Sequence, residues 1–203
     1  MTEIKTLYDK IYSSNQSKDS KVFIDIYESN KDLIENADYS ISNPDFEGIL
    51  RIVSDYALAL SSYGSTSKAL PYLDKAIQLF KDSSPNELTG SPIYEALIWT
   101  RGFNNFNIKK IKLATLDFDF LVENYPDNDK YRSWLLASKT VKFKKITHNL
   151  WYLLIVIVIW YIVIKADDVK LKNGLLIGII VISFIAILTE IAIGYIKRSV
   201  KRK

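Results

Sequence analysis

The sequence predicts an all-α protein, in which a helical body at residues 1–138 precedes a two-helix transmembrane hairpin at residues 139–203. Three observations support this division. The body consists of amphipathic segments between short polar breaks and lacks the alternating apolar pattern of strands. Two long apolar runs follow it. The charge changes sign at the same place, because the body has 15 Lys and Arg against 20 Asp and Glu, whereas the hairpin has 12 against 3.

The amphipathic segments place the helices of the body. We expect them at residues 2–13, 18–36, 44–63, 67–82, 92–105, 109–124 and 129–146, with the last continuing into the first membrane span. Two helix starts are marked by a capping residue before a proline, Asn43 before Pro44 and Ser91 before Pro92. An N-cap side chain accepts a hydrogen bond from the first turn of a helix, where proline is tolerated.

Two stretches of the body, residues 50–82 and 92–128, repeat one pattern. Each stretch has two small residues 12 positions apart, Ala57 with Ala69 and Gly102 with Ala114. A small residue in each of two consecutive helices lets the helices cross closely, while larger apolar residues fill the space to the next pair. The spacing therefore predicts two successive helix pairs.

The segments YALALSSYGSTSKALPYLDKAIQLF and LATLDFDFLVENYPDN resemble the tetratricopeptide (TPR) repeat, whose pattern is W-x-x-L-G-x-x-Y, then A-x-x-x-F, then P. Arg101 and Asn105 depart from the pattern, since they stand where it has Leu and Tyr. The resemblance implies an antiparallel helix-pair solenoid of about three pairs. Residues 3–36 would form a degenerate first pair, and residues 129–146 a capping helix.

In TPR proteins the first helix of each pair lines a concave groove that receives peptides. The resemblance therefore implies a partner-binding set here, formed by Arg51, Asp55, Leu58, Trp99, Phe103, Phe106 and Asn107. The three aromatic residues of this set are spaced i, i+4 and i+7 and so share one helical face. Aromatic side chains often anchor a bound peptide. The alternative is that they are core, packed against the first repeats or against the polar insertion at residues 82–92 between the repeats.

The hairpin is predicted from two apolar runs, Leu150–Ile164 and Leu175–Ile196, with spans at about 147–165 and 174–196. About 20 apolar residues cross a bilayer core of roughly 30 Å. Nine Lys and Arg flank the outer ends of the hairpin, against three in the connecting loop, so both termini are expected in the cytosol. The abundance of Ile and Lys favours a bacterial inner or plasma membrane.

A stripe of mostly small residues recurs every four positions in the second span, at Gly174, Gly178, Ile182, Ala186, Glu190 and Gly194. Small residues let helix backbones approach closely, so we expect this stripe to pack against the first span or, alternatively, against a second copy. Glu190 is expected opposite His148 and Asn149 as a hydrogen-bonded clasp. The alternative is a proton or ion relay, since carboxylates within membranes are functional candidates.

Several function classes find no support. The chain has no cysteine and one histidine, which leaves no thiol nucleophile, no Cys-ligated metal and no Ser/His/Asp arrangement. No glycine-rich phosphate loop occurs, and the positive charge lies at the membrane edges instead of on the body, so nucleotide and nucleic-acid binding are not expected. Asp127-Asn128-Asp129 is expected to cap a helix and not to bind calcium. The sequence thus predicts no enzyme, no catalytic residue, no metal and no cofactor.

The expected function is that of a membrane-anchored adaptor or scaffold that binds a protein or peptide partner at the cytosolic membrane face. Its basic flanks would also contact an anionic leaflet. The alternative is an oligomerising two-span membrane effector or small channel subunit, with the body as its sensor. The sequence leaves open whether the chain forms a homo-oligomer or belongs to a larger membrane complex.

Overall fold

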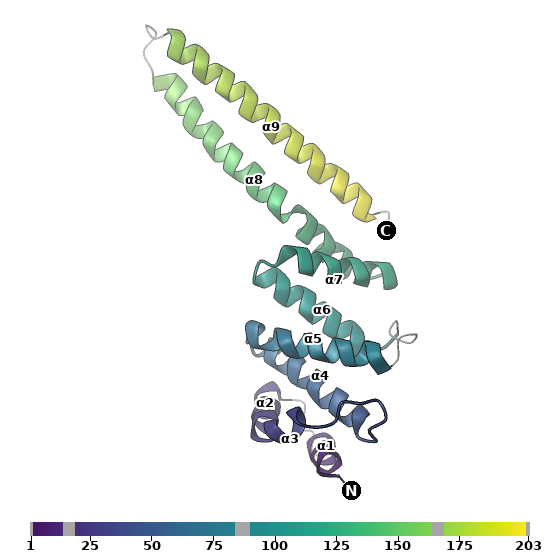
Figure 1. Cartoon of the computed structure of the whole chain (residues 1–203). Helices are drawn as coiled ribbons and strands as arrows, with labels where there is room; N and C mark the ends of the chain where they lie inside the picture. The colour runs from purple at the N-terminus through teal and green to yellow at the C-terminus, as the bar shows by residue number, and fades with distance from the viewer. Residues whose placement is uncertain (1, 14–18, 84–89, 164–168, 202–203) are drawn as a thin grey trace. The chain divides into compact units, whose positions relative to one another are not determined.

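The computed structural model describes residues 2–13, 19–83, 90–163 and 169–201, and every element within these ranges is an α-helix. The prediction of an all-α protein is thus confirmed. The chain divides into two units, Met1–Tyr125 and Pro126–Lys203 (Figure 1). The division precedes the expected boundary at residue 138, because residues 129–146 belong to the same unbroken helix as the first apolar run.

Unit 1 contains α1 Glu3–Ser13, α2 Ser20–Ser29, α3 Lys31–Glu35, α4 Phe46–Ser62, α5 Thr66–Ser83, α6 Pro92–Asn107 and α7 Ile111–Asn124. The single helix expected over residues 18–36 is therefore wrong, since it breaks at Asn30. The Asn30 side-chain amide donates to the carbonyl of Ile26 at 2.8 Å, and its backbone has a non-helical φ of −118°. Asparagine side chains compete with helix geometry in this way.

The two expected helix starts differ in outcome. Ser91 caps α6 as predicted, with its hydroxyl accepting from the Tyr94 amide at 3.4 Å and a proline following it. Helix α4, in contrast, begins at Phe46, two residues later than expected. The Asn43 side chain accepts from the Asp45 amide at 3.0 Å, which forms a turn before the helix.

Consecutive helices pack in pairs, α4 against α5 and α6 against α7, while α5 also contacts α6 (Figure 1). The small residues lie in these interfaces, since Ala57, Ala69 and Ala114 are fully buried. At Gly102 the approach is closest: an added Cβ would lie 3.0 Å from Cβ of Asp117 and from the Phe118 ring. Glycine there lets α6 lie directly on α7.

A polar contact joins the same helices. The Arg101 guanidinium donates to both carboxylate oxygens of Asp117 on α7, at 2.5 and 3.1 Å, and to Asp74 on α5 at 2.9 Å. Burial raises the pKa of Asp117, and the two hydrogen bonds from Arg101 oppose that shift. Arg101 stands where the TPR pattern has Leu, and its buried partner on the next helix, Asp117, gives the arginine a structural role at that position.

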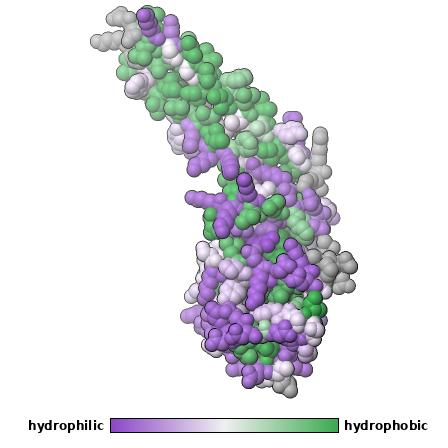
Figure 2. Space-filling model, viewed as in Figure 1, coloured by the Kyte–Doolittle hydropathy of each residue, from purple (hydrophilic) through white to green (hydrophobic). Residues whose placement is uncertain are grey.

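Unit 2 contains α8 Asp129–Val163 and α9 Val169–Lys201, which pack against each other along their length (Figure 1). Asn128 caps α8 as expected, since its side chain accepts from the Lys130 amide at 3.1 Å. Both helices are long and apolar enough to cross a membrane. Only 6% of the most apolar 18-residue window of α8, and 11% of that of α9, is buried within the chain. Figure 2 shows the resulting hydrophobic surface, whereas hydrophilic residues cover most of the visible face of unit 1.

The close approach at Gly102 gives a stability prediction. Neither Asp117, held by Arg101, nor the fully buried Phe118 can move away, so Gly102→Ala is expected to lower the free energy of unfolding by about 1–2 kcal/mol through overpacking. Gly48→Ala in α4 is the matched control, because its Cβ would meet only the Tyr8 ring at an ordinary 3.4 Å. There the better helix propensity of alanine should add roughly 0.5–1 kcal/mol. Chemical denaturation followed by circular dichroism measures both, and a stabilised Gly102→Ala would contradict the packing account.

Candidate partner-binding site

Unit 1 contains a cavity of about 740 Å³ between α1, the first half of α4, the end of α5 and the start of α6. We call it the α1–α4 cavity. Its lining is formed by Ile4, Lys5, Tyr8, Asp9, Ile41, Pro44, Asp45, Phe46, Glu47, Gly48, Leu50, Arg51, Phe80, Ser83, Ser91 and Ile93. The volume lies within the range of about 300–1,000 Å³ that is usual for ligand pockets.

The floor of the α1–α4 cavity is apolar. Phe46 and Leu50, one turn apart on α4, form a buried cluster with Leu79 of α5, and Phe80 packs against that cluster. Charged residues of both signs line the cavity as well, with Lys5 and Asp9 on α1 and Glu47 on α4. A surface of this kind can receive apolar side chains and pair with charges beside them.

Helix α1 forms one wall because its apolar face is buried on the body. Ile4, Leu7 and Ile11 are buried, at helical spacing, and the intervening Tyr8 lines the cavity beside Gly48. The Tyr8 ring lies over Gly48 at a distance that leaves room for a Cβ at ordinary contact. The amphipathic pattern of α1 thus places both the wall and its aromatic residue.

A polar clamp fixes the other end of α1. The Tyr12 hydroxyl donates to Oδ2 of Asp55 at 2.7 Å, and Nε of Arg51 donates to the same oxygen at 2.8 Å. The Arg51 guanidinium lies 5.6 Å from the centre of the Tyr12 ring. Burial, together with the charge of Asp55, raises the pKa of Tyr12. The hydroxyl therefore stays protonated and keeps donating at physiological pH.

The expected partner-binding residues lie on two helices, α4 and α6. Arg51 lines the α1–α4 cavity, whereas Asp55 is engaged by Tyr12 and Leu58 is half-buried. Trp99 stacks on Phe103, with ring centres 6.2 Å apart, and lies 5.6 Å from the ring of Phe118 on α7. These aromatics, and Phe106, are half-buried, while Asn107 is exposed. The ring contact with α7 favours the interpretation of Trp99 as core. Residues 84–89 of the insertion lie outside the described residues.

Most residues of the α1–α4 cavity were not among the predicted site residues. Tyr8, Phe46 and Phe80 come from three separate helices, and no spacing in the sequence links them. The one available signal was the amphipathic pattern of residues 3–13, which predicts a helix with a buried face but not the surface on which it lies.

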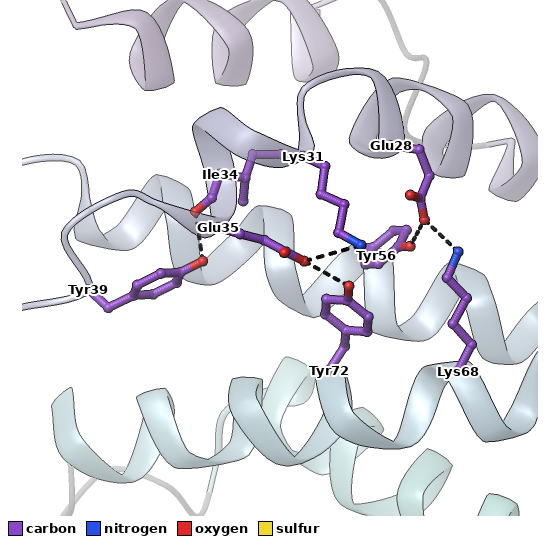
Figure 3. A network of polar contacts seen from close by, with 8 residues as sticks. All are labelled: Glu28, Lys31, Ile34, Glu35, Tyr39, Tyr56, Lys68 and Tyr72. Carbon is purple, nitrogen blue, oxygen red and sulfur yellow. Dashed lines mark hydrogen bonds and ion pairs between the residues drawn. The ribbon is translucent and has the colours of Figure 1, made fainter.

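A second polar network joins α2 and α3 to the helix pair α4–α5 (Figure 3). Glu28 of α2 accepts hydrogen bonds from the Tyr56 hydroxyl of α4 and, at 2.6 Å, from the Lys68 ammonium of α5. Glu35 of α3 accepts from the Tyr72 hydroxyl of α5 at 2.7 Å. Figure 3 shows these side chains pointing toward one another from their helices. The network therefore holds the N-terminal helices in place on the body.

The charges of this network shift the pKa values of its members. The hydrogen bond from Lys68, and next that from Tyr56, hold the pKa of Glu28 below its ordinary value of 4.5. Burial raises the pKa of Tyr39, beside the network, to about 12. Glu28 is therefore ionised and Tyr39 protonated at neutral pH, which suits structural hydrogen bonds.

In unit 2, the small-residue stripe does not pack against α8 as expected. The buried residues of α9 are Ala186, Ile193 and Val200, seven positions apart. A period of four residues advances about 400° around a helix, so a stripe with that period turns about 40° per step away from a straight contact line. Only Ala186 therefore faces α8, and an added Cβ at Gly174, Gly178 or Gly194 would meet nothing within 4 Å.

The expected clasp at Glu190 is also not formed. The hydroxyl groups of Thr147 and Thr189 are 2.7 Å apart and provide the polar contact between the helices at this level. Glu190 is exposed, and the His148 ring lies edge-on against Tyr152, with centres 4.6 Å apart. The clasp is thus replaced by a pair of threonines one residue away on each helix.

No family model matches this sequence, and neither a curated protein nor a solved structure matches it significantly. The resemblance to TPR repeats therefore stays a prediction. Within the described parts of the chain, no three His, Asp or Glu side chains lie close enough together to hold a metal ion. What the geometry offers is a cavity for binding.

The network around Glu28 gives a pH-dependent prediction. Because the pKa of Glu28 is lowered by folding, its stabilising effect is present above about pH 4.5 and is lost as the pH falls through the folded value. Glu28→Gln should therefore lower the free energy of unfolding by about 1 kcal/mol at pH 7, a modest value because solvent screens a side chain that is 34% exposed. At pH 3 the difference from wild type should be smaller, because protonation of Glu28 then removes part of this effect.

Hydrogen exchange of peptides from α2 and α4, compared at pH 7 and pH 3 with correction for intrinsic rates, measures this effect. Glu47→Gln at an exposed position of α4 serves as a control for the loss of one carboxylate charge, since among the described residues the Glu47 side chain forms no ion pair. An effect of Glu28→Gln that is equal at both pH values would contradict an ionic role.

Proposed function

We propose that the protein is a membrane-anchored adaptor or scaffold, whose helical body binds a protein or peptide partner in the α1–α4 cavity. The observation that carries this proposal is the cavity itself, with its apolar floor and lining charges of both signs. It is supported by the exposed apolar surface of α8 and α9, which would hold the body at a membrane. Binding and anchoring together describe an adaptor.

We further propose that the body is a TPR-like array. The pairs α4–α5 and α6–α7, with small residues in their interfaces, support this arrangement. In this proposal residues 3–36, which hold α1, α2 and α3, stand as the degenerate first pair. Glu28 and Glu35 hold α2 and α3 to the array, and α1 forms the cavity.

The membrane arrangement belongs to the proposal as well. Apolar surface of this extent is stable in lipid, and the basic residues beyond each apolar run would lie in the headgroup region. Four lysines precede the first run, and Lys197 and Arg198 follow the second. Both ends would therefore lie on the cytosolic side of a membrane, which the residue usage favours as a bacterial inner or plasma membrane.

The chemistry of the α1–α4 cavity describes its partner. The exposed Ile41 and the half-buried Phe80 and Ile93 offer a surface for one or two apolar side chains of a peptide. Lys5 and Glu47, of opposite charge, would fix the orientation of that peptide by pairing with charges beside the apolar anchor. A segment that combines an apolar anchor with flanking charges is the expected ligand.

Two exposed apolar residues make a matched test. Ile41 lines the α1–α4 cavity and is 58% exposed, whereas Leu116 on α7 is 65% exposed and lies outside it. Ile41→Glu should weaken partner binding at least about tenfold, because a buried charge in the interface costs more than about 1.4 kcal/mol. Leu116→Glu should leave binding unchanged. Neither substitution disturbs a buried side chain.

Photocrosslinking from a reactive residue at the exposed Glu47 position, followed by mass spectrometry, identifies what occupies the cavity, and affinity capture in mild detergent compares the two variants. A crosslinked protein that is lost with Ile41→Glu and retained with Leu116→Glu supports the adaptor. No crosslink, or equal capture by both variants, would contradict it and make the alternative, an oligomerising membrane effector, the better hypothesis.

A further inference from the structure

Two adjoining cavities lie between α8 and α9 in unit 2, and they share Gly194 and Arg198. The first, of about 480 Å³, we call the apolar groove; its lining includes Trp151, Ile187, Ile191 and Tyr195. The second, of about 750 Å³, we call the basic cavity; it is lined by Arg132 of α8 and by Lys197, Arg198 and Lys201 of α9, among others. Both lie wholly within unit 2.

The apolar groove exists because α9 has small residues beside it. Ala186 is buried against α8, and an added Cβ at Gly194 would meet nothing within 4 Å, so the missing side chain leaves open space. Trp151 and Tyr195 are largely exposed on either side. An extended hydrocarbon chain fits a groove with this lining.

The basic cavity brings four cationic side chains together with one carboxylate. Asp129 accepts from Nη1 of Arg132 at 2.9 Å, which leaves the cavity with an excess of positive charge. Nε of Arg132 is buried without a hydrogen-bond partner in the described structure. Among the described residues, no ion pair is formed by Lys197, Arg198 or Lys201. The cavity thus offers unused donors and charge to an anion.

The two cavities are continuous in a defined direction. Gly194 and Arg198 are one turn apart on the same face of α9, so the apolar groove opens toward the basic cavity. Glu190, the one carboxylate in the groove, lies about 12 Å along the helix from Arg198. The negative charge of Glu190 disfavours an anion beside it in the apolar groove. An amphiphilic ligand is therefore oriented with its anionic group near Arg198.

We propose that this composite site binds one anionic phospholipid, with its phosphate among Arg132, Lys197 and Arg198 and an acyl chain along the apolar groove. The proposal rests on the proposed insertion of α8 and α9 into a membrane. Basic pockets between membrane helices on the cytosolic side are suited to phospholipid headgroups. The groove distinguishes a lipid from a free phosphate, because only a lipid fills both cavities.

The test uses the full chain, purified in detergent without lipid, and native mass spectrometry to count bound lipids during titration with phosphatidylglycerol or phosphatidylcholine. Wild type should bind one molecule of phosphatidylglycerol and should bind phosphatidylcholine at least tenfold more weakly. Arg132→Gln with Arg198→Gln should weaken phosphatidylglycerol binding at least tenfold. Lys142→Gln with Lys144→Gln, which removes the same charge from exposed positions of α8 outside both cavities, should change it no more than about twofold.

Two further comparisons distinguish a bound lipid from a soluble anion and from general charge attraction. Gly194→Leu fills the groove and leaves the charges in place, so this variant should also fail to bind phosphatidylglycerol. If it still binds the lipid, and if wild type binds inorganic phosphate as tightly as the lipid, the ligand is a soluble anion and the lipid proposal is wrong. Equal loss in both charge-removing variants would overturn the site in favour of general attraction to anionic lipid.

Flotation of the protein with liposomes tests membrane anchoring separately from lipid binding at this site. A chain that floats as an integral protein but retains no stoichiometric lipid overturns the lipid site alone. A chain that does not float overturns both the membrane anchor and the site built on it.

Discussion

A chain of 203 residues cannot bury the apolar surface of two helices of 35 and 33 residues, and α8 and α9 leave nearly all of their most apolar windows exposed. This unburied surface is the constraint on which the rest of the account depends. Exposed apolar area costs about 25 cal/mol per Å² in water. The proposed membrane would remove that cost, and it is also the setting in which we interpret the basic flanks and the open groove at Gly194.

Hydrogen bonds to charged side chains join the helices of the body at several points. Arg101 joins α5, α6 and α7, Glu28 and Glu35 join α2 and α3 to the next pair, and the Tyr12 clamp holds α1 on α4. Each of these contacts is a hydrogen bond to an ionised group, and such hydrogen bonds are stronger than those between neutral groups. The Tyr12 clamp, together with the buried face formed by Ile4, Leu7 and Ile11, holds α1 in place, and α1 forms one wall of the α1–α4 cavity.

Much of the fold could be predicted from the sequence, because helix class and length follow from local periodicity. The continuous helix through residues 129–163 was predicted from its periodicity, and the cap at Ser91 from the capping residue before a proline. The break at Asn30 was not, since it depends on one side chain competing for a helix hydrogen bond. The expected packing of the glycine stripe failed because a four-residue period rotates around α9, whereas the contact with α8 follows a seven-residue period. The α1–α4 cavity was missed because four separate segments of the chain form it.

Because the sequence has no cysteine, a single introduced thiol reports its own position, which makes accessibility to a membrane-impermeant maleimide the most direct test of the membrane hairpin. Three exposed positions suffice: Asp82→Cys in the body, Lys170→Cys at the start of α9 and Ser199→Cys near its end. The account predicts that intact cells are labelled only at Lys170→Cys and that the other two react after permeabilisation. Labelling of all three from the same side, or release of the chain by alkaline carbonate, would contradict it.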